Sequence, residues 1–180
     1  MRNFTYPSYR LSAASAEIKI IYTGFLTFAT VGMLTIGLYQ FKRIGTTYDL
    51  VVAYYRGGDL RQEMAFPKTF VQLLETTHFH AFIMGVSFLI LAHLLIATSL
   101  RPRAKWLFIG LAFFSSQADL AGPWLIRYLS PAFAFLHLSS WLTMWLGYGA
   151  MIVVPLYEMW GKGSLLTGRE IARKEETGAP

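Results

Sequence analysis

The sequence contains no cysteine and few charged residues, and each lack excludes a class of protein. Without cysteine the chain forms no disulfide, no thiolate-ligated iron–sulfur cluster and no covalent c-type haem attachment. Only 14% of the 180 residues are charged and 54% are hydrophobic, whereas soluble domains carry about 25% charged residues. This composition indicates an integral membrane protein. The lack of cysteine does not exclude haem b, because histidine alone can ligate its iron.

Four stretches are long and apolar enough to cross a bilayer, since a transmembrane helix needs roughly 20 mainly apolar residues. The predicted fold is therefore all-α, a single membrane domain (1–180) built as a bundle of four transmembrane helices. A long loop (42–73) separates the first two spans, and Thr47 to Tyr55 predicts a short helix within it. The predicted spans are residues 18–41, 74–100, 106–128 and 132–160.

Positive charge sets the predicted orientation. Arg101, Arg103 and Lys105 lie in the short connection between the second and third spans, which the positive-inside rule places in the cytoplasm. Both termini are then cytoplasmic (N-in, C-in), with the tail 161–180 inside and the loop 42–73 outside. The net charge of +6 sits at helix ends, which favours contact with the lipid bilayer and no nucleic-acid partner.

All four histidines fall within predicted spans, where ionisable groups cost a few kcal/mol each and are functional candidates by default. In the predicted orientation, one set of polar side chains shares a depth toward the outer face, while His93 lies nearer the cytoplasm. Residues of this set come from the second, third and fourth spans: Glu75, His78, His80, Gln117, Asp119 and His137.

Helical angles separate the two histidines at the start of the second span. His78 shares its face with Ala81 and Gly85, and small residues allow close approach of another helix or a flat cofactor. The face of His80 carries larger aliphatic side chains. We therefore predict that His78 points inward and ligates a haem b iron together with His137, while His80 lies at the helix margin.

The 15-residue separation of His78 and His93 resembles the spacing in quinol-oxidising membrane b cytochromes, which stack two haems across the bilayer. A second haem would need His93 and Met151 as ligands, and Arg127 could hold propionates. The alternatives are that Met151 fills the core, that His93 only hydrogen-bonds between helices, and that Arg127 pairs with Asp119.

Two further readings of the polar set remain open. Carboxylate and imidazole groups suit a non-haem metal, for which the ligand candidates are Glu75, His78, His80, Asp119 and His137. Alternatively, Glu75 and Asp119 exchange protons through histidine without any metal.

Two segments resemble a family of uncharacterised four-span bacterial membrane proteins. The first runs from Phe66-Pro67-Lys68-Thr69-Phe70 into Leu74-Glu75-Thr76-Thr77-His78-Phe79-His80. The second comprises Gly122-Pro123-Trp124-Leu125-Ile126-Arg127-Tyr128 and, further on, Val154-Pro155-Leu156-Tyr157-Glu158-Met159-Trp160. The resemblance implies a multi-pass protein of the bacterial inner membrane and carries no activity.

The function expected from these features is that of a small b-type cytochrome or redox subunit of an electron-transfer complex. It would link the quinone pool to an outer-face partner, with Glu75 or Asp119 handling the quinol proton. Its partners would be other membrane or periplasmic redox subunits, so that the chain is a subunit of an oxidoreductase complex rather than an enzyme alone. The alternatives are a cofactor-free accessory or assembly subunit and a non-haem metal or proton-handling membrane protein.

Overall fold

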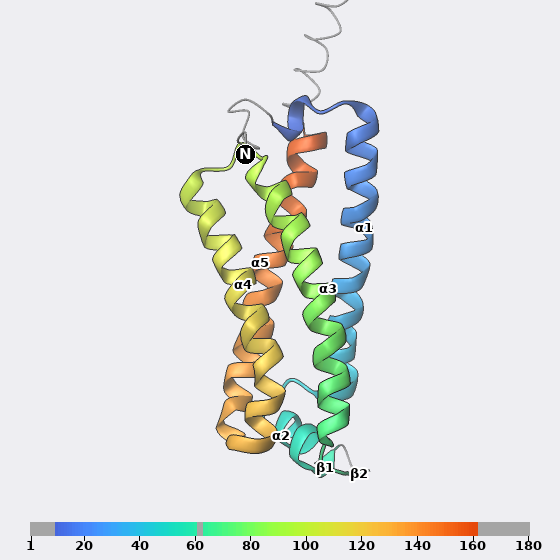
Figure 1. Ribbon diagram of the computed structural model, residues 1–180, viewed down its shortest axis with the longest axis vertical. Helices are drawn as coiled ribbons and strands as arrows, with labels where there is room; N and C mark the ends of the chain where they lie inside the picture. Colours follow the sequence, from blue (N-terminus) through green and yellow to red (C-terminus); the bar gives the residue numbers. More distant parts are fainter. Residues whose placement is uncertain (1–9, 61–62, 162–180) are drawn as a thin grey trace, which may run out of the picture.

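The computed structural model describes residues 10–60 and 63–161, and there the chain is almost entirely helical. Its long helices lie side by side along one axis (Figure 1): α1 (Ala16–Tyr39), α3 (Phe70–Ile96), α4 (Pro102–Trp124) and α5 (Ala134–Trp160). The predicted all-α class is confirmed. The predicted cytoplasmic tail beyond Gly161 lies outside the described residues.

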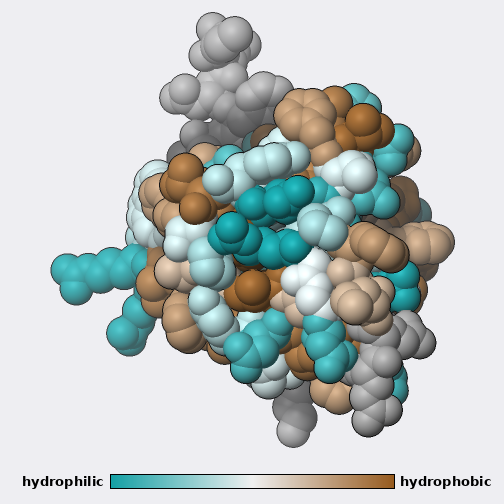
Figure 2. All heavy atoms as spheres, turned by 90° about the horizontal axis from the view of Figure 1, so that it is seen from below, coloured by the Kyte–Doolittle hydropathy of each residue, from teal (hydrophilic) through white to brown (hydrophobic). Residues whose placement is uncertain are grey.

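The connection between α1 and α3 folds back against one end of the bundle. It contains the short helix α2 (Tyr48–Arg56), as predicted to within a residue, and two antiparallel strands that the sequence analysis missed, β1 (Gly58–Leu60) and β2 (Glu63–Ala65). We call this the α2 end (Figure 1). Figure 2 looks onto it and shows hydrophilic side chains gathered over its middle, with hydrophobic ones around them.

Short irregular turns extend three of the long helices at the α2 end. π-Helical turns follow α1 (η2, Gln40–Ile44) and α4 (η3, Leu125–Leu129), and a 3-10 turn precedes α5 (η4, Pro131–Phe133). A further 3-10 turn lies before α1 at the opposite end (η1, Leu11–Ala13). Single π turns within helices are frequent at functional sites.

Local hydrogen bonds explain where α3 begins and ends. The Thr69 hydroxyl accepts from the Gln72 backbone while the Gln72 side chain accepts from the Thr69 backbone, which is a complete capping box. At the opposite end Lys105 Nζ donates to the carbonyls of Ile96 and Thr98. The helix therefore begins and ends about four residues earlier than its predicted span (74–100).

Within the described residues, three segments are long and apolar enough to cross a membrane: 16–44, 70–96 and 131–160. They agree with the first, second and fourth predicted spans. Helix α4, the third predicted span, is less apolar because it carries Arg103, Lys105 and Asp119 together with a run of polar residues at 115–117.

Helices α4 and α5 form the most extensive contact in the described chain. Gly147 of α5 makes it possible, because a Cβ there would lie 2.7 Å from the Ala112 backbone nitrogen of α4. Helix α1 packs chiefly on α5, with Gly37 against the Trp145 ring. Toward the end opposite α2, a buried core joins the four long helices and the η1 turn: Leu11, Leu26, Leu91, Leu95, Ala112, Met151 and Met159.

We predict that Gly147→Ala destabilises the bundle, because the added methyl meets α4 backbone that cannot move without separating the two helices. Gly110→Ala is the matched control, since a Cβ at Gly110 has open space around it. Thermal unfolding in detergent should show a lower midpoint for Gly147→Ala alone. Equal midpoints for the two variants would contradict the close packing of α4 on α5.

Candidate functional site

Asp119 of α4 and His137 of α5 meet between these two helices near the α2 end. His137 Nδ1 lies 3.5 Å from Asp119 Oδ1, and the two side chains are 4% and 19% exposed, respectively. Gly122 lets α4 pass this close, because a Cβ there would lie 3.2 Å from His137 Nδ1. The sequence analysis predicted a shared depth for Asp119 and His137, and the structure brings them into contact.

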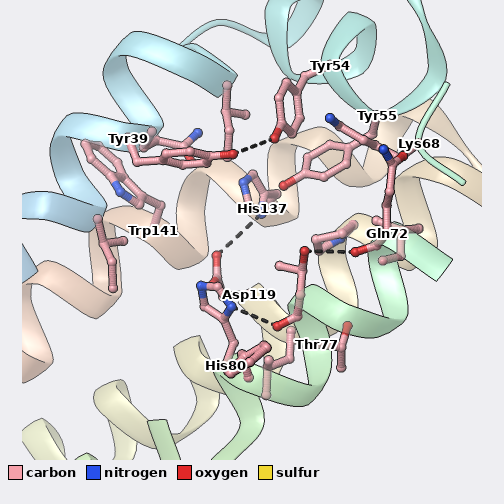
Figure 3. A pocket seen from close by; sticks show the side chains of 18 of the residues that line it. Tyr39, Tyr54, Tyr55, Lys68, Gln72, Thr77, His80, Asp119, His137 and Trp141 are labelled. Atoms are coloured by element: carbon pink, nitrogen blue, oxygen red, sulfur yellow. Dashed lines mark hydrogen bonds and ion pairs between the residues drawn. The ribbon is translucent and has the colours of Figure 1, made fainter. Parts of the chain in front are cut away.

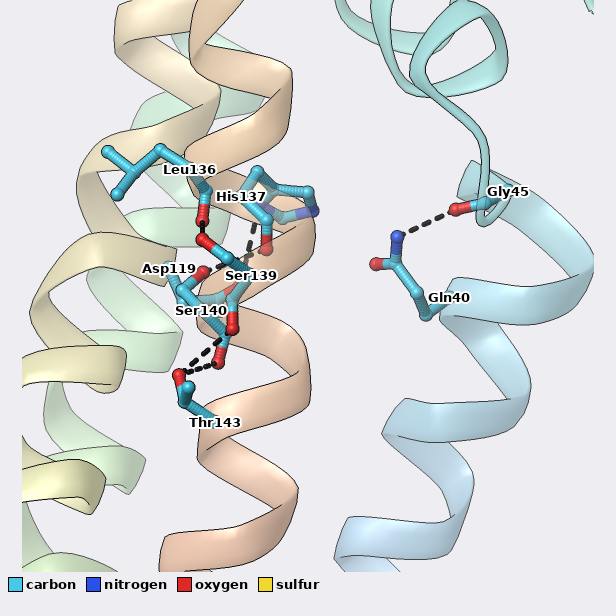
Figure 4. A network of polar contacts seen from close by, with 8 residues as sticks. All are labelled: Gln40, Gly45, Asp119, Leu136, His137, Ser139, Ser140 and Thr143. Carbon is cyan, nitrogen blue, oxygen red and sulfur yellow. Dashed lines mark hydrogen bonds and ion pairs between the residues drawn. The ribbon is translucent and has the colours of Figure 1, made fainter.

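Neither ring nitrogen of His137 has a hydrogen-bond partner among the described residues. The hydroxyls on the following turns are used by α5 itself, since Ser140 donates to the His137 carbonyl and Thr143 to the Ser139 carbonyl (Figure 4). The Tyr55 ring stands edge-on to the imidazole, with centroids 5.6 Å apart. A buried imidazole that lacks partners is costly unless a further group completes its hydrogen bonds.

A cavity of about 790 Å³ lies beside the pair (Figure 3). Its wall is drawn from α1, α2, α3, α4 and α5, and includes the Asp119 and His137 side chains. Aromatic residues from four elements also line it: Tyr39, Tyr54, Tyr55, Phe79 and Trp141. Of the predicted polar set, the cavity therefore brings Glu75, His80, Asp119 and His137 to one end of the bundle, but not His78 or Gln117.

The tyrosines of this wall were missed by the sequence analysis. The hydroxyls of Tyr39 and Tyr54 lie 2.9 Å apart, and Lys68 Nζ sits 4.2 Å from the centre of the Tyr54 ring. Burial raises the pKa of Tyr54 and raises that of Tyr55 well above its ordinary value, and the charge of Asp119 adds to the effect at Tyr55. Both phenols stay protonated at neutral pH, so both can donate hydrogen bonds.

On α3 it is His80, and not His78, that lines the cavity. Figure 3 shows the His80 ring beside Asp119, and its Nδ1 bonds the Thr76 carbonyl at 2.8 Å. His78 is exposed and its ring contacts Phe79. The predicted inward position of His78 is therefore wrong. His78 and His80 point about 200° apart around the helix axis, so the helix that turns His80 to the cavity turns His78 away from it.

The faces of α3 also differ in part from the prediction. Ala81 and Gly85 are exposed, with open space at the Cβ position of Gly85, while Leu91 and Leu94 are buried in the core. The size of a side chain does not decide its face, since Ile83 is exposed and Ala92 is buried. Both kinds of surface are apolar, so hydrophobicity alone did not distinguish them.

The other three predicted residues of this region, Glu75, Gln117 and Arg127, do not take part in the Asp119–His137 pair. Glu75 is exposed and lines the cavity margin, and Gln117 is exposed elsewhere on α4. Arg127 Nε donates to the Lys68 carbonyl at 2.9 Å, which fastens the chain ahead of α3. The ion pair that Asp119 makes in the described chain is with His137, so its predicted alternative pairing with Arg127 is wrong.

The structure separates the candidate ligands of a second haem. His93 is exposed, and its Nδ1 lies 2.7 Å from the Leu89 carbonyl of its own helix. Met151 is fully buried in the hydrophobic core. Met151 therefore fills the core, as one of the two interpretations predicted. His93 lies away from the cavity, in agreement with its predicted depth nearer the cytoplasm.

The arrangement gives no support to the ligand sets drawn from the sequence. His78 and His137 do not lie at a common site, so they do not fit as the axial pair of one haem; haem b itself stays a prediction. Across residues 10–60 and 63–161, no three or more His, Asp and Glu side chains are grouped to hold a metal ion. The predicted non-haem set thus does not converge: Glu75, His78, His80, Asp119 and His137.

Residues 45–165 match the model of the family Aq_1264_TM, described as a transmembrane helical domain, and the protein belongs to this family. The match covers more than half of the chain and includes α2 to α5, hence both members of the Asp119–His137 pair. Membership of an uncharacterised membrane-protein family is thereby confirmed, whereas the cytochrome resemblance is not shown. Comparisons with curated proteins and with solved structures gave no match.

We predict that Gly122→Ala disturbs the pair without unfolding the bundle, because the new methyl would press on the His137 ring. In ¹⁵N-histidine-labelled protein, the His137 signal, assigned by its loss in His137→Gln, should shift. Gly110→Ala should leave it in place. An unchanged His137 signal in Gly122→Ala would show that α4 does not pass the imidazole this closely.

Proposed function

We propose that this protein is a proton-handling membrane subunit in which Asp119 and His137 exchange a proton with a ligand bound in the cavity. One observation carries the proposal: a buried imidazole, in ion-pair range of a carboxylate and with neither nitrogen hydrogen-bonded in the described chain, forms part of the cavity wall. Intramembrane pairs of this kind are costly to maintain, and they mark proton and ion pathways.

The chemistry available to the pair is general acid–base exchange. Imidazole changes charge in the range of about pH 5 to 8, and a neighbouring carboxylate stabilises the charged ring. Because the Nδ1–Oδ1 distance of 3.5 Å is longer than a good hydrogen bond, either group is free to bond a ligand. Exposed Glu75 and Gln72 at the cavity margin offer a polar route to the α2 end.

We further propose that α4 is a fourth span and that the chain is N-in and C-in in the bacterial inner membrane. Helix α4 has 23 residues, about 34 Å at the usual rise, against a hydrocarbon core of about 30 Å. Arg101 and Arg103 lie at the end opposite α2, which favours the cytoplasmic side for that end. The cavity would then face the outer half of the bilayer.

The redox setting is also a proposal. A proton-exchanging site within a membrane bundle suits a subunit of an electron-transfer complex, with electrons carried by partner subunits. Of the three roles that the sequence analysis gave to the polar set, the geometry favours the proton role of Asp119 over haem ligation by His78 and His137 and over a non-haem metal site. The proton role needs only residues that meet at the cavity.

We predict that the carboxyl group of Asp119 responds to bulk pH together with His137. In pH-jump infrared difference spectra of the protein in lipid nanodiscs, a carboxylic C=O band should change when the pH crosses the range of about 5 to 8 in which imidazole changes its charge. The band should be absent in Asp119→Asn and altered in His137→Gln, because each removes one member of the pair.

Glu75→Gln is the control for the ion pair, since Glu75 is exposed at the margin and not part of the pair. As a residue of the polar route it can change the rate of the response, but it should leave the Asp119 band in place at equilibrium. A spectrum that is identical in wild type and Asp119→Asn across this pH range would contradict proton exchange at the pair.

The accessory-subunit alternative is favoured by a different observation, the exposure of His78 and His93 on α3. A histidine that faces lipid costs free energy, whereas contact with another subunit would satisfy it. In this case the α3 face with Ala81 and Gly85 would be the contact surface.

We predict that His78→Leu reduces the assembled fraction of the protein in native mass spectrometry of membrane extracts, because leucine cannot bond a partner. The control is His80→Leu, which alters the cavity side of α3. If His78 faces only lipid, His78→Leu should instead raise the thermal midpoint and leave the assembly mass unchanged, and the accessory reading would then be wrong.

A further inference from the structure

The cavity is open on the side between α1 and α3. Its α1 margin is formed by Thr35, Ile36 and Tyr39, and its α3 margin includes Thr76 and Phe79; all of these residues are exposed. The two margins belong to segments 16–44 and 70–96, both long and apolar enough to span a membrane. The opening therefore faces the bilayer rather than water.

Helix α1 keeps this opening because it packs more closely on α5 than on α3. Gly37 of α1 lies against Trp145, and Trp160 of α5 donates to the Thr23 hydroxyl at 2.9 Å. Gly32 of α1, one turn before Ile36, has open space at its Cβ position. An apolar chain could thus lie along α1 there without displacing a packed side chain.

The cavity wall changes from polar to apolar along the bundle axis. Lys68, Gln72 and Tyr54 line it at the α2 end. Ile36 and Met144 line it farther in, Met144 being seven residues beyond His137 and hence about 10 Å deeper along α5. A ligand that matches this wall has a polar head at the α2 end and an apolar tail toward the middle of the bilayer.

The groups around the head position define its chemistry. Trp141 Nε1 and His137 Nε2 are buried without a hydrogen-bond partner in the described chain, and the Trp141 ring lines the cavity with Tyr55. The Trp141 indole N–H only donates and calls for an oxygen acceptor, whereas His137 Nε2 donates or accepts according to the protonation of the ring. A flat ring that carries carbonyl or hydroxyl oxygens satisfies both groups. A fixed anion would face the Asp119 carboxylate, so an uncharged head is favoured.

We infer that the cavity binds a single-chain amphiphile with an uncharged, oxygen-bearing ring as its head, of the quinone–quinol class, taken from the bilayer between α1 and α3. This inference rests on the proposed function for the proton exchange, and it adds the ligand class and the route. The ring lies among Tyr55, Trp141 and His137, and the chain leaves past Ile36 and Phe79.

The test uses decylubiquinone as the probe and the full chain in lipid nanodiscs, because quinones quench tryptophan fluorescence on contact. Quenching of the wild type should be saturable. Trp141→Phe should lose the saturable part or weaken binding at least about tenfold. Trp106→Phe, which changes an exposed tryptophan at the opposite end, should keep it. Equal, non-saturable quenching in both variants would overturn the inference.

The head group is tested by competition with decanoate, a single-chain anion without a ring. Decanoate should not displace the quinone; equal competition would overturn the ring-headed class. The route is tested with Ile36→Cys/Phe79→Cys, whose two thiols are the only ones in this cysteine-free chain. Joining them with a bis-maleimide should slow binding, and an unchanged rate relative to the uncrosslinked variant would overturn access between α1 and α3.

Failure of this inference is distinguishable from failure of the proposed function. Saturable quinone binding without an infrared response at Asp119 supports the ligand class and contradicts the proton role. An infrared response to pH without saturable binding supports the proton role and overturns the ligand class.

Discussion

The contact between Asp119 and His137 constrains the rest of the site, because two ionisable side chains are held between apolar helices. Burying such groups costs several kcal/mol unless each is paired. The pair exists only because α4 and α5 come close, and that approach depends on Gly122 beside the imidazole and on Gly147 against Ala112. A pair with a purely structural role would cost less free energy if its hydrogen bonds were complete. Here neither imidazole nitrogen is hydrogen-bonded within the described residues.

The remaining elements turn this pair into a site. Helix α2 folds under the bundle and brings Tyr54 and Tyr55 to the cavity, where their protonated hydroxyls add donors to its wall. Helix α1 contributes Tyr39 but rests on α5, which leaves the side toward α3 open. In the binding that we propose, polar groups at the α2 end would meet the head of a ligand, and its apolar tail would extend toward the bilayer. A membrane-dissolved molecule would then reach the pair without crossing water.

Depth in the membrane was predictable from the sequence, whereas direction around a helix was not. Orientation and the rise per residue placed Asp119 level with His137, and these residues do meet. The same reasoning failed for His78, because lipid-facing and core-facing surfaces are both apolar, and Gly85 faces outward while Leu91 fills the core. Tyr54 and Tyr55 were missed because a loop helix gives no signal for the bundle end that it covers.

The central claim is that a carboxylate and an imidazole meet at the cavity in the folded protein within a bilayer. The most direct measurement is a solid-state NMR dipolar distance between the ¹⁵N-labelled His137 ring and the ¹³C-labelled Asp119 carboxyl group in lipid. Our account predicts strong coupling, consistent with the 3.5 Å separation of Nδ1 and Oδ1. Absence of detectable coupling would show that α4 and α5 do not bring these side chains together, and would contradict the account.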